Sequence, residues 1–96
     1  MKKIFVPILL CFSSLTIAAS FNCEKAKTEI EKIICSNDPL NQLDENLLIS
    51  YKEALNLTED KGTLKKNQLA WLSKIRNKCK DNICLERVYR EQIGSL

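Results

Sequence analysis

Four cysteines spread between residues 23 and 84 constrain this chain more than any other feature. They are Cys23, Cys35, Cys79 and Cys84. An even number of cysteines in a short exported chain indicates a disulfide framework. A domain of this size buries only about 60% of the surface of its unfolded chain, so its core alone leaves a thin stability margin. We therefore expect a small domain braced by two disulfides.

The first 19 residues have the parts of an export signal. Lys2 and Lys3 provide positive charge, residues 4–12 are apolar apart from Pro7, and the segment ends in small residues. The apolar run is shorter than the roughly 20 residues of a membrane-spanning helix. We therefore predict a signal peptide over residues 1–19 and a single domain over residues 20–96.

A fifth cysteine, Cys11, lies within this predicted signal. Leu10 precedes it, where a lipid-attachment site requires a small residue, and Cys11 lies inside the apolar run instead of at its end. We interpret Cys11 as part of the discarded signal. The prediction is thus a periplasmic or secreted protein that is not a lipoprotein and whose mature chain has no transmembrane anchor.

The composition of the mature chain excludes several classes of function. Without Lys2 and Lys3, 13 of the 15 basic side chains remain against 12 acidic ones, a net charge of +1 that gives no electrostatic footprint for nucleic acid. The chain has no histidine, so no Ser–His or Cys–His pair exists, and zinc lacks its commonest nitrogen ligand. We expect no catalytic residue, no metal and no cofactor.

Periodic leucines and isoleucines, with only two glycines and two prolines, predict an all-α fold. A first helix is expected from Thr28 to Cys35, because Thr28 and Glu31 have capping-box spacing. A second is expected from an Asp38 cap, with Pro39 in its first turn, to about Thr58.

Two further helices complete the predicted bundle. One begins after Thr63 and ends near Cys79, and the other follows a cap at Asp81 and ends at Gly94. The short polar connection at residues 59–62 predicts that the second and third helices form an antiparallel hairpin. The fold expected is a disulfide-braced bundle of about four helices.

Four cysteines allow three pairings, and bridge geometry favours Cys23–Cys35 with Cys79–Cys84. Bridged Cα atoms lie about 4.4–6.8 Å apart, so a Cys79–Cys84 bridge requires the corner that the Asp81 cap predicts. A Cys23–Cys35 bridge requires the chain before Thr28 to fold back over the first helix. The main rival pairing links Cys35 to one of the two later cysteines.

An ordered set of residues resembles a known family. It comprises Phe21-Asn22-Cys23, Ala26, Glu31, Ile34-Cys35, Leu40, Leu43-Asp44, Leu47, Tyr51, Gln68, Trp71, Arg76, Cys79, Cys84-Leu85 and Tyr89-Arg90. The set is similar to the LprI-like family of bacterial exported proteins, which is named for a mycobacterial lysozyme inhibitor. The resemblance implies a helical, disulfide-containing module of the cell envelope that binds a lysozyme or another envelope protein.

The resemblance suggests lysozyme inhibition, and lysozymes are generally basic. An inhibitor should therefore present carboxylates, and we predict that Glu59 and Asp60, at the tip of the helical hairpin, supply them. Two alternatives remain open: a structural or stress-associated periplasmic factor, and a small hydrolase that acts through carboxylates.

Several other residues invite functional readings but fit structural ones. Glu31 fits capping, while Asp44, Arg76 and Arg90 fit ion pairs between helices. Trp71 lies at helical spacing with leucines and is expected in the core.

Overall fold

The computed structural model describes residues 21–96, which form an all-α fold. The predicted signal peptide and Cys11 lie outside the described residues. The elements in chain order are a 3-10 helix η2 (Cys23–Lys25), α1 (Glu29–Ser36), α2 (Asp38–Leu57), α3 (Lys61–Lys74), a 3-10 helix η3 (Arg76–Lys78) and α4 (Asn82–Ser95). Within residues 21–96, no helix has the length and apolar character that crossing a membrane requires.

Helix α1 begins as its sequence predicts. The Thr28 hydroxyl accepts a 3.1 Å hydrogen bond from the backbone N–H of Glu31, and the Glu31 carboxylate accepts from the N–H of Thr28. This capping box supplies partners for N–H groups that have none within the helix.

The predicted start of the second helix is wrong by one residue. Asn37, not Asp38, is the N-cap of α2, and its side-chain oxygen accepts from the N–H of Leu40 at 3.1 Å. Asp38 is instead the first residue of the helix, where a carboxylate suits the positive end of the helix dipole. Pro39 lies in this first turn, as expected.

Both predicted ends of the third helix are also wrong. Helix α3 begins at Lys61, two residues before Thr63, because the carboxylate of Asp60 caps it. It ends at Lys74, and the chain tightens into η3 before Cys79. The Asp81 cap of α4 is confirmed by a 2.8 Å bond from the N–H of Cys84.

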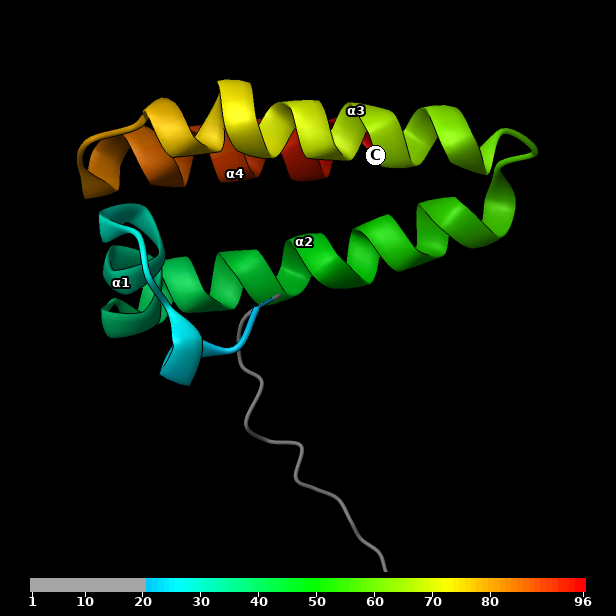
Figure 1. The fold of residues 1–96 in the computed structure, drawn as a ribbon. Helices are drawn as coiled ribbons and strands as arrows, with labels where there is room; N and C mark the ends of the chain where they lie inside the picture. Colours follow the sequence, from blue (N-terminus) through cyan, green and yellow to red (C-terminus); the bar gives the residue numbers. More distant parts are fainter. Residues whose placement is uncertain (1–20) are drawn as a thin grey trace, which may run out of the picture.

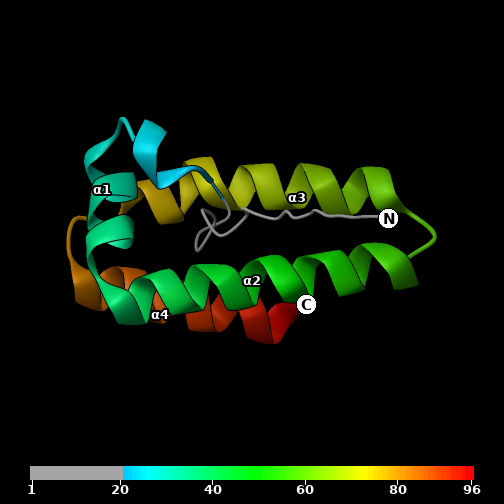
Figure 2. The same ribbon diagram turned by 90° about the horizontal axis from the view of Figure 1, so that it is seen from below.

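Helices α2 and α4 run in the same direction, while α3 runs antiparallel to both (Figure 1). Among the helices, α2 packs most closely against α4. In Figure 2, the ribbons of α2 and α4 overlap, in agreement with their close packing, and the ribbon of α3 lies to one side of them. Helix α1 closes one end of this arrangement, and the α2–α3 turn forms the other.

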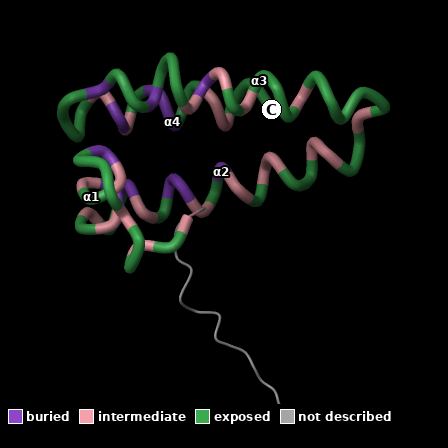
Figure 3. Tube along the Cα trace, in the orientation of Figure 1, coloured by how far each residue is buried: buried purple, intermediate pink, exposed green. Residues whose placement is uncertain are grey.

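The buried side chains gather at the α1 end of the molecule (Figure 3). They are Ile30 and Ile34 of α1, Leu40, Leu43, Asp44 and Leu47 of α2, Trp71 of α3, Arg76, Cys79, and Leu85, Val88 and Tyr89 of α4. No residue between 48 and 70 is buried. Beyond the C-terminus of α4, the hairpin therefore continues without a core of its own.

Candidate functional site

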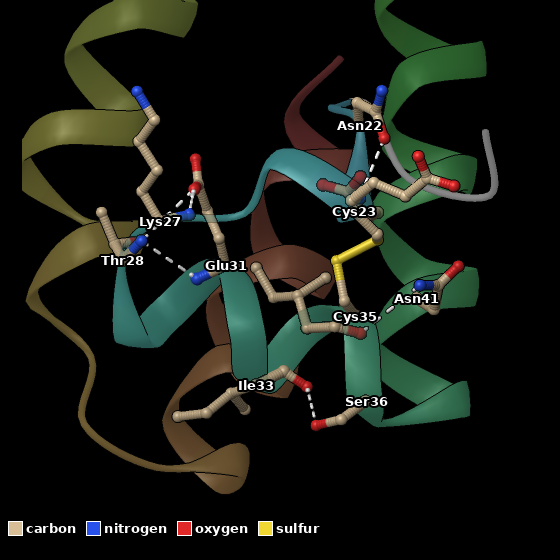
Figure 4. Close-up of a disulfide and its surroundings, with 12 residues drawn as sticks. Asn22, Cys23, Lys27, Thr28, Glu31, Ile33, Cys35, Ser36 and Asn41 are labelled. Atoms are coloured by element: carbon tan, nitrogen blue, oxygen red, sulfur yellow. Dashed lines mark hydrogen bonds between the residues drawn. A yellow bond between two sulfur atoms is a disulfide. The ribbon is translucent and has the colours of Figure 1, made fainter. Parts of the chain in front are cut away.

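The first disulfide holds the chain before α1 against that helix (Figure 4). Cys23 and Cys35 are joined with their Cα atoms 5.8 Å apart, as the favoured pairing requires. The 3-10 turn that carries Cys23 is capped by the side chain of Asn22, which accepts from the N–H of Glu24 at 2.9 Å. The backbone N–H of Lys27 donates a hydrogen bond, also 2.9 Å long, to the Glu31 carboxylate, and this bond joins the returning chain to the start of α1. The bridge therefore closes a segment that local hydrogen bonds already bend.

The second disulfide braces the corner between η3 and α4. Cys79 and Cys84 are joined across the Asp81 cap with their Cα atoms 5.5 Å apart. Cys79 is buried in the core and Cys84 packs against it, so this bridge forms part of the core and fixes where α4 leaves it. The pairing favoured from the sequence is thus the one that the structure contains.

A polar cluster lies inside the apolar core. Tyr89 donates a 2.5 Å hydrogen bond to Asp44, and both side chains are at most 1% exposed. Burial raises the pKa of Tyr89 strongly, the Asp44 carboxylate raises it further, and the Arg76 guanidinium acts in the opposite direction. The cluster therefore brings Asp44 and Arg76 together around one hydroxyl group.

Two aromatic contacts surround this cluster. Trp71 meets Tyr89 edge to face with ring centroids 5.3 Å apart, which places Trp71 in the core as predicted. The Arg76 guanidinium lies 5.6 Å from the ring centroid of Phe21 and donates a 3.0 Å bond to Asn77. Stacking on an aromatic face is a favourable position for a weakly hydrated guanidinium. The first contact joins α3 to α4, and the second joins η3 to the chain just before η2.

The structure gives the candidate acid residues Glu31 and Asp44 structural partners. Glu31 accepts from the backbone at the start of α1, and Asp44 accepts from Tyr89. Arg90 is exposed on α4, where the ion pair joins Arg87 to Glu91. Among residues 21–96, no three His, Cys, Asp or Glu side chains gather where they would hold a metal ion.

An apolar groove that was not predicted from the sequence runs between α2 and α3. Its volume is about 360 Å³, and it is lined by Asp44, Leu47, Leu48 and Tyr51 of α2 and Lys65, Gln68, Leu69 and Leu72 of α3. Gln68 is held at its edge by a 2.9 Å bond from Gln92 of α4. A groove of this kind is an ordinary feature of a ligand or protein contact surface. No local pattern signals it, because the groove depends on the distance between two helices, which tertiary packing sets.

Glu59 and Asp60 lie in the turn between α2 and α3, at the far end from α1, and both are exposed. Asp60 accepts from the hydroxyl of Thr63 at 2.7 Å and from its backbone N–H at 3.0 Å. These two bonds lower the pKa of Asp60, so it carries its charge over a wider pH range. The turn is therefore both a helix cap and an exposed acidic surface.

The stretch just before α3 is acidic as a whole. Residues 53–60 hold three carboxylates and no basic side chain. Leu57, within this stretch, has 85% of its surface exposed. We call residues 53–60 the acidic tip.

A family model described as lysozyme inhibitor LprI matches residues 22–96 of this chain. The matched part includes both disulfides, the polar cluster, the groove and the acidic tip. No curated protein and no solved structure matches the chain. Because the family model covers more than three-quarters of the sequence, the chain belongs to the lysozyme inhibitor LprI family.

Proposed function

We propose that this protein is an exported lysozyme inhibitor that acts by binding to the enzyme. Membership of the lysozyme inhibitor LprI family is the observation that carries the proposal. Two disulfides in a small helical domain suit an oxidising compartment such as the periplasm or the extracellular space. Lysozyme acts on the bacterial envelope, so an inhibitor at that location meets the enzyme where it works.

The acidic tip is the surface that we propose binds lysozyme. Its carboxylates complement a basic enzyme, and opposite charges speed the encounter of two proteins. Exposed Leu57 adds an apolar contact beside Glu59 and Asp60. Because the tip lies farthest from the disulfide-braced core, it can contact a partner while the core remains rigid. Inhibition follows if the bound protein covers the cleft that admits the polysaccharide.

A turbidity assay of bacterial cell-wall lysis tests this function. Purified protein with both disulfides formed is expected to slow lysis by lysozyme in a dose-dependent way. Lysis that stays unchanged at every protein concentration would contradict the inhibitor proposal. Peptidoglycan incubated with the protein alone tests the hydrolase alternative, which released fragments would support.

A double variant, Glu59→Gln with Asp60→Asn, tests the surface. Asparagine is a good helix cap, so the start of α3 is retained while two charges are removed. We expect inhibition about fivefold weaker than that of the original protein, with less sensitivity to salt. The control, Glu24→Gln with Glu29→Gln, removes two charges at the α1 end and should inhibit like the original protein. Equal inhibition by all three proteins would exclude the acidic tip as the surface that binds lysozyme.

A further inference from the structure

The outward side of α2 and α3 exposes apolar side chains beside the groove. Leu69 of α3 is 66% exposed and Ile49 of α2 is 54% exposed. Leu48 and Leu69 line the groove from opposite helices, and Lys65 lies at its edge. Since α4 packs against the other side of α2, this outward side is not covered by the fold.

The side chains on this side of α2 form a self-complementary strip. Glu45, Leu48, Ile49 and Lys52 follow one another at spacings of three, one and three, which places them along one stripe of the helix. An acid therefore lies at one end, a base at the other, and two aliphatic side chains lie between them. Reversing the direction of the strip exchanges the acid and the base.

The charges at the two ends of the strip have no ion-pair partner among residues 21–96. Glu45 accepts a 3.3 Å hydrogen bond from the neutral side chain of Gln42. The exposed ion pair of Arg87 and Glu91 lies on α4, away from the strip. Both Glu45 and Lys52 are thus available to a molecule that covers the strip.

We propose that a second copy of this chain covers the strip, with the two α2 helices antiparallel about a two-fold axis that passes between Leu48 and Ile49. In that register, Glu45 faces the partner's Lys52, and Lys52 faces the partner's Glu45. The two charges lie about 10.5 Å apart along each helix, so both pairs form at once. At the centre, Leu48 faces the partner's Ile49 and Ile49 faces the partner's Leu48, as the two-fold symmetry requires.

The balance of charge favours a second copy over a different partner. A strongly acidic or basic partner would pair with one end of the strip and repel the other. Leu69 extends the apolar contact onto α3, but the strip and Leu69 are far fewer than the roughly 20–30 residues a side of a standard stable interface. The pairing is therefore a weak, concentration-dependent dimer. Its antiparallel arrangement points the two acidic tips in opposite directions.

Sedimentation velocity on the disulfide-bonded protein tests the dimer. Over roughly 5–500 µM, the average mass should rise from that of one chain towards that of two. A mass that stays at one chain over the whole range would overturn the proposal.

Charge reversal tests the register. Glu45→Lys alone, or Lys52→Glu alone, puts like charges opposite each other in both pairs, so each should raise the dissociation constant about tenfold or more. The double variant, Glu45→Lys with Lys52→Glu, restores both pairs and should dimerise like the original protein. A double variant as weak as the single ones would overturn the antiparallel register.

A matched control separates this effect from a change in net charge. Glu91→Lys changes the net charge of the chain as Glu45→Lys does, but on the exposed surface of α4, where it breaks only a surface ion pair of small value. It should leave the dimer unchanged. Lysozyme inhibition by the Glu45→Lys variant is measured separately, because this dimer does not rest on the proposed function. A control that weakens the dimer as much as Glu45→Lys would contradict the assigned surface.

Discussion

The hydroxyl of Tyr89 on α4 donates a 2.5 Å hydrogen bond to the carboxylate of Asp44 on α2. These residues are 45 positions apart in the chain, and both are almost completely buried. The bond therefore fixes the two helices that pack most closely, and Trp71 connects α3 to it through the ring of Tyr89. The hairpin of α2 and α3, with its acidic tip, extends from this fixed end of the molecule.

Tyr89→Phe is expected to lower the free energy of unfolding by about 1–3 kcal/mol, because a buried carboxylate loses a hydrogen bond. The ring, and with it the contact to Trp71, is retained. Urea denaturation measures the change. Tyr51→Phe is the control: Tyr51 lies half-buried at the groove, and its variant should stay within about 0.5 kcal/mol of the original protein. Equal stability of the two variants would show that the buried bond is not a main tie.

Stability should fall at alkaline pH because of the same residue. Burial holds the pKa of Tyr89 above its ordinary value of about 10, so the unfolded chain releases this proton at lower pH than the folded one. The contribution is complete below about pH 10 and is lost as the pH rises through the folded-state pKa. Denaturation series at pH 9 to 11, about one unit either side of the ordinary pKa, should show this fall in the original protein. The fall should be smaller in Tyr89→Phe, and an identical fall in both would contradict the assignment.

The two disulfides should contribute unequally. The Cys23–Cys35 bridge spans 12 positions and the Cys79–Cys84 bridge spans five. Loop-closure entropy then predicts losses of about 3 and about 2 kcal/mol when each pair is replaced by serine or alanine. Urea denaturation of the two double variants measures both losses. A larger loss from the second pair would mean that its buried packing around Cys79 outweighs the effect on the unfolded chain.

Asp60 should titrate below the ordinary aspartate pKa of about 3.9, because its charged form accepts two hydrogen bonds from Thr63. The stability from these bonds is present above that ordinary value and is lost as the pH falls through the lowered pKa. NMR titration of the carboxyl group measures the midpoint. Thr63→Ala removes the hydroxyl donor and should move the midpoint upward. A midpoint at the ordinary value in the original protein would contradict the cap geometry.

Local features of the fold were predictable because neighbouring residues determine them. The capping box of Thr28 and Glu31 and the cap at Asp81 depend on side chains three positions from the N–H groups they bind. The disulfide pairing followed from the corner that the Asp81 cap imposes. The start of α2 was predicted one residue late because Asn37 and Asp38 are both good caps, and only the backbone conformation selects between them.

The start of α3 was missed for a related reason. Thr63 is a residue type that often caps helices. In the structure Asp60 is the cap, because its carboxylate accepts hydrogen bonds from the N–H and the hydroxyl of Thr63, so Gly62 lies in the first turn of α3. A third helix that reached Cys79 would include Ile75, but α3 ends at Lys74 and the chain tightens into η3, which leaves Ile75 45% exposed.

The sites formed by distant residues were not predictable from spacing. Nothing local pairs Tyr89 with Asp44, or Arg76 with Phe21. The groove depends on how far α3 lies from α2, and tertiary packing sets that distance. The position of Asp44 in the apolar stripe of α2 was the one local sign that its carboxylate needed a buried partner.

Isothermal titration of a purified lysozyme with the disulfide-bonded protein measures the proposed binding itself. Saturable binding with one enzyme per chain is expected, and the affinity should fall when Glu59 and Asp60 are neutralised. No detectable heat, together with separate elution of the two proteins on a sizing column, would show that the protein does not bind lysozyme.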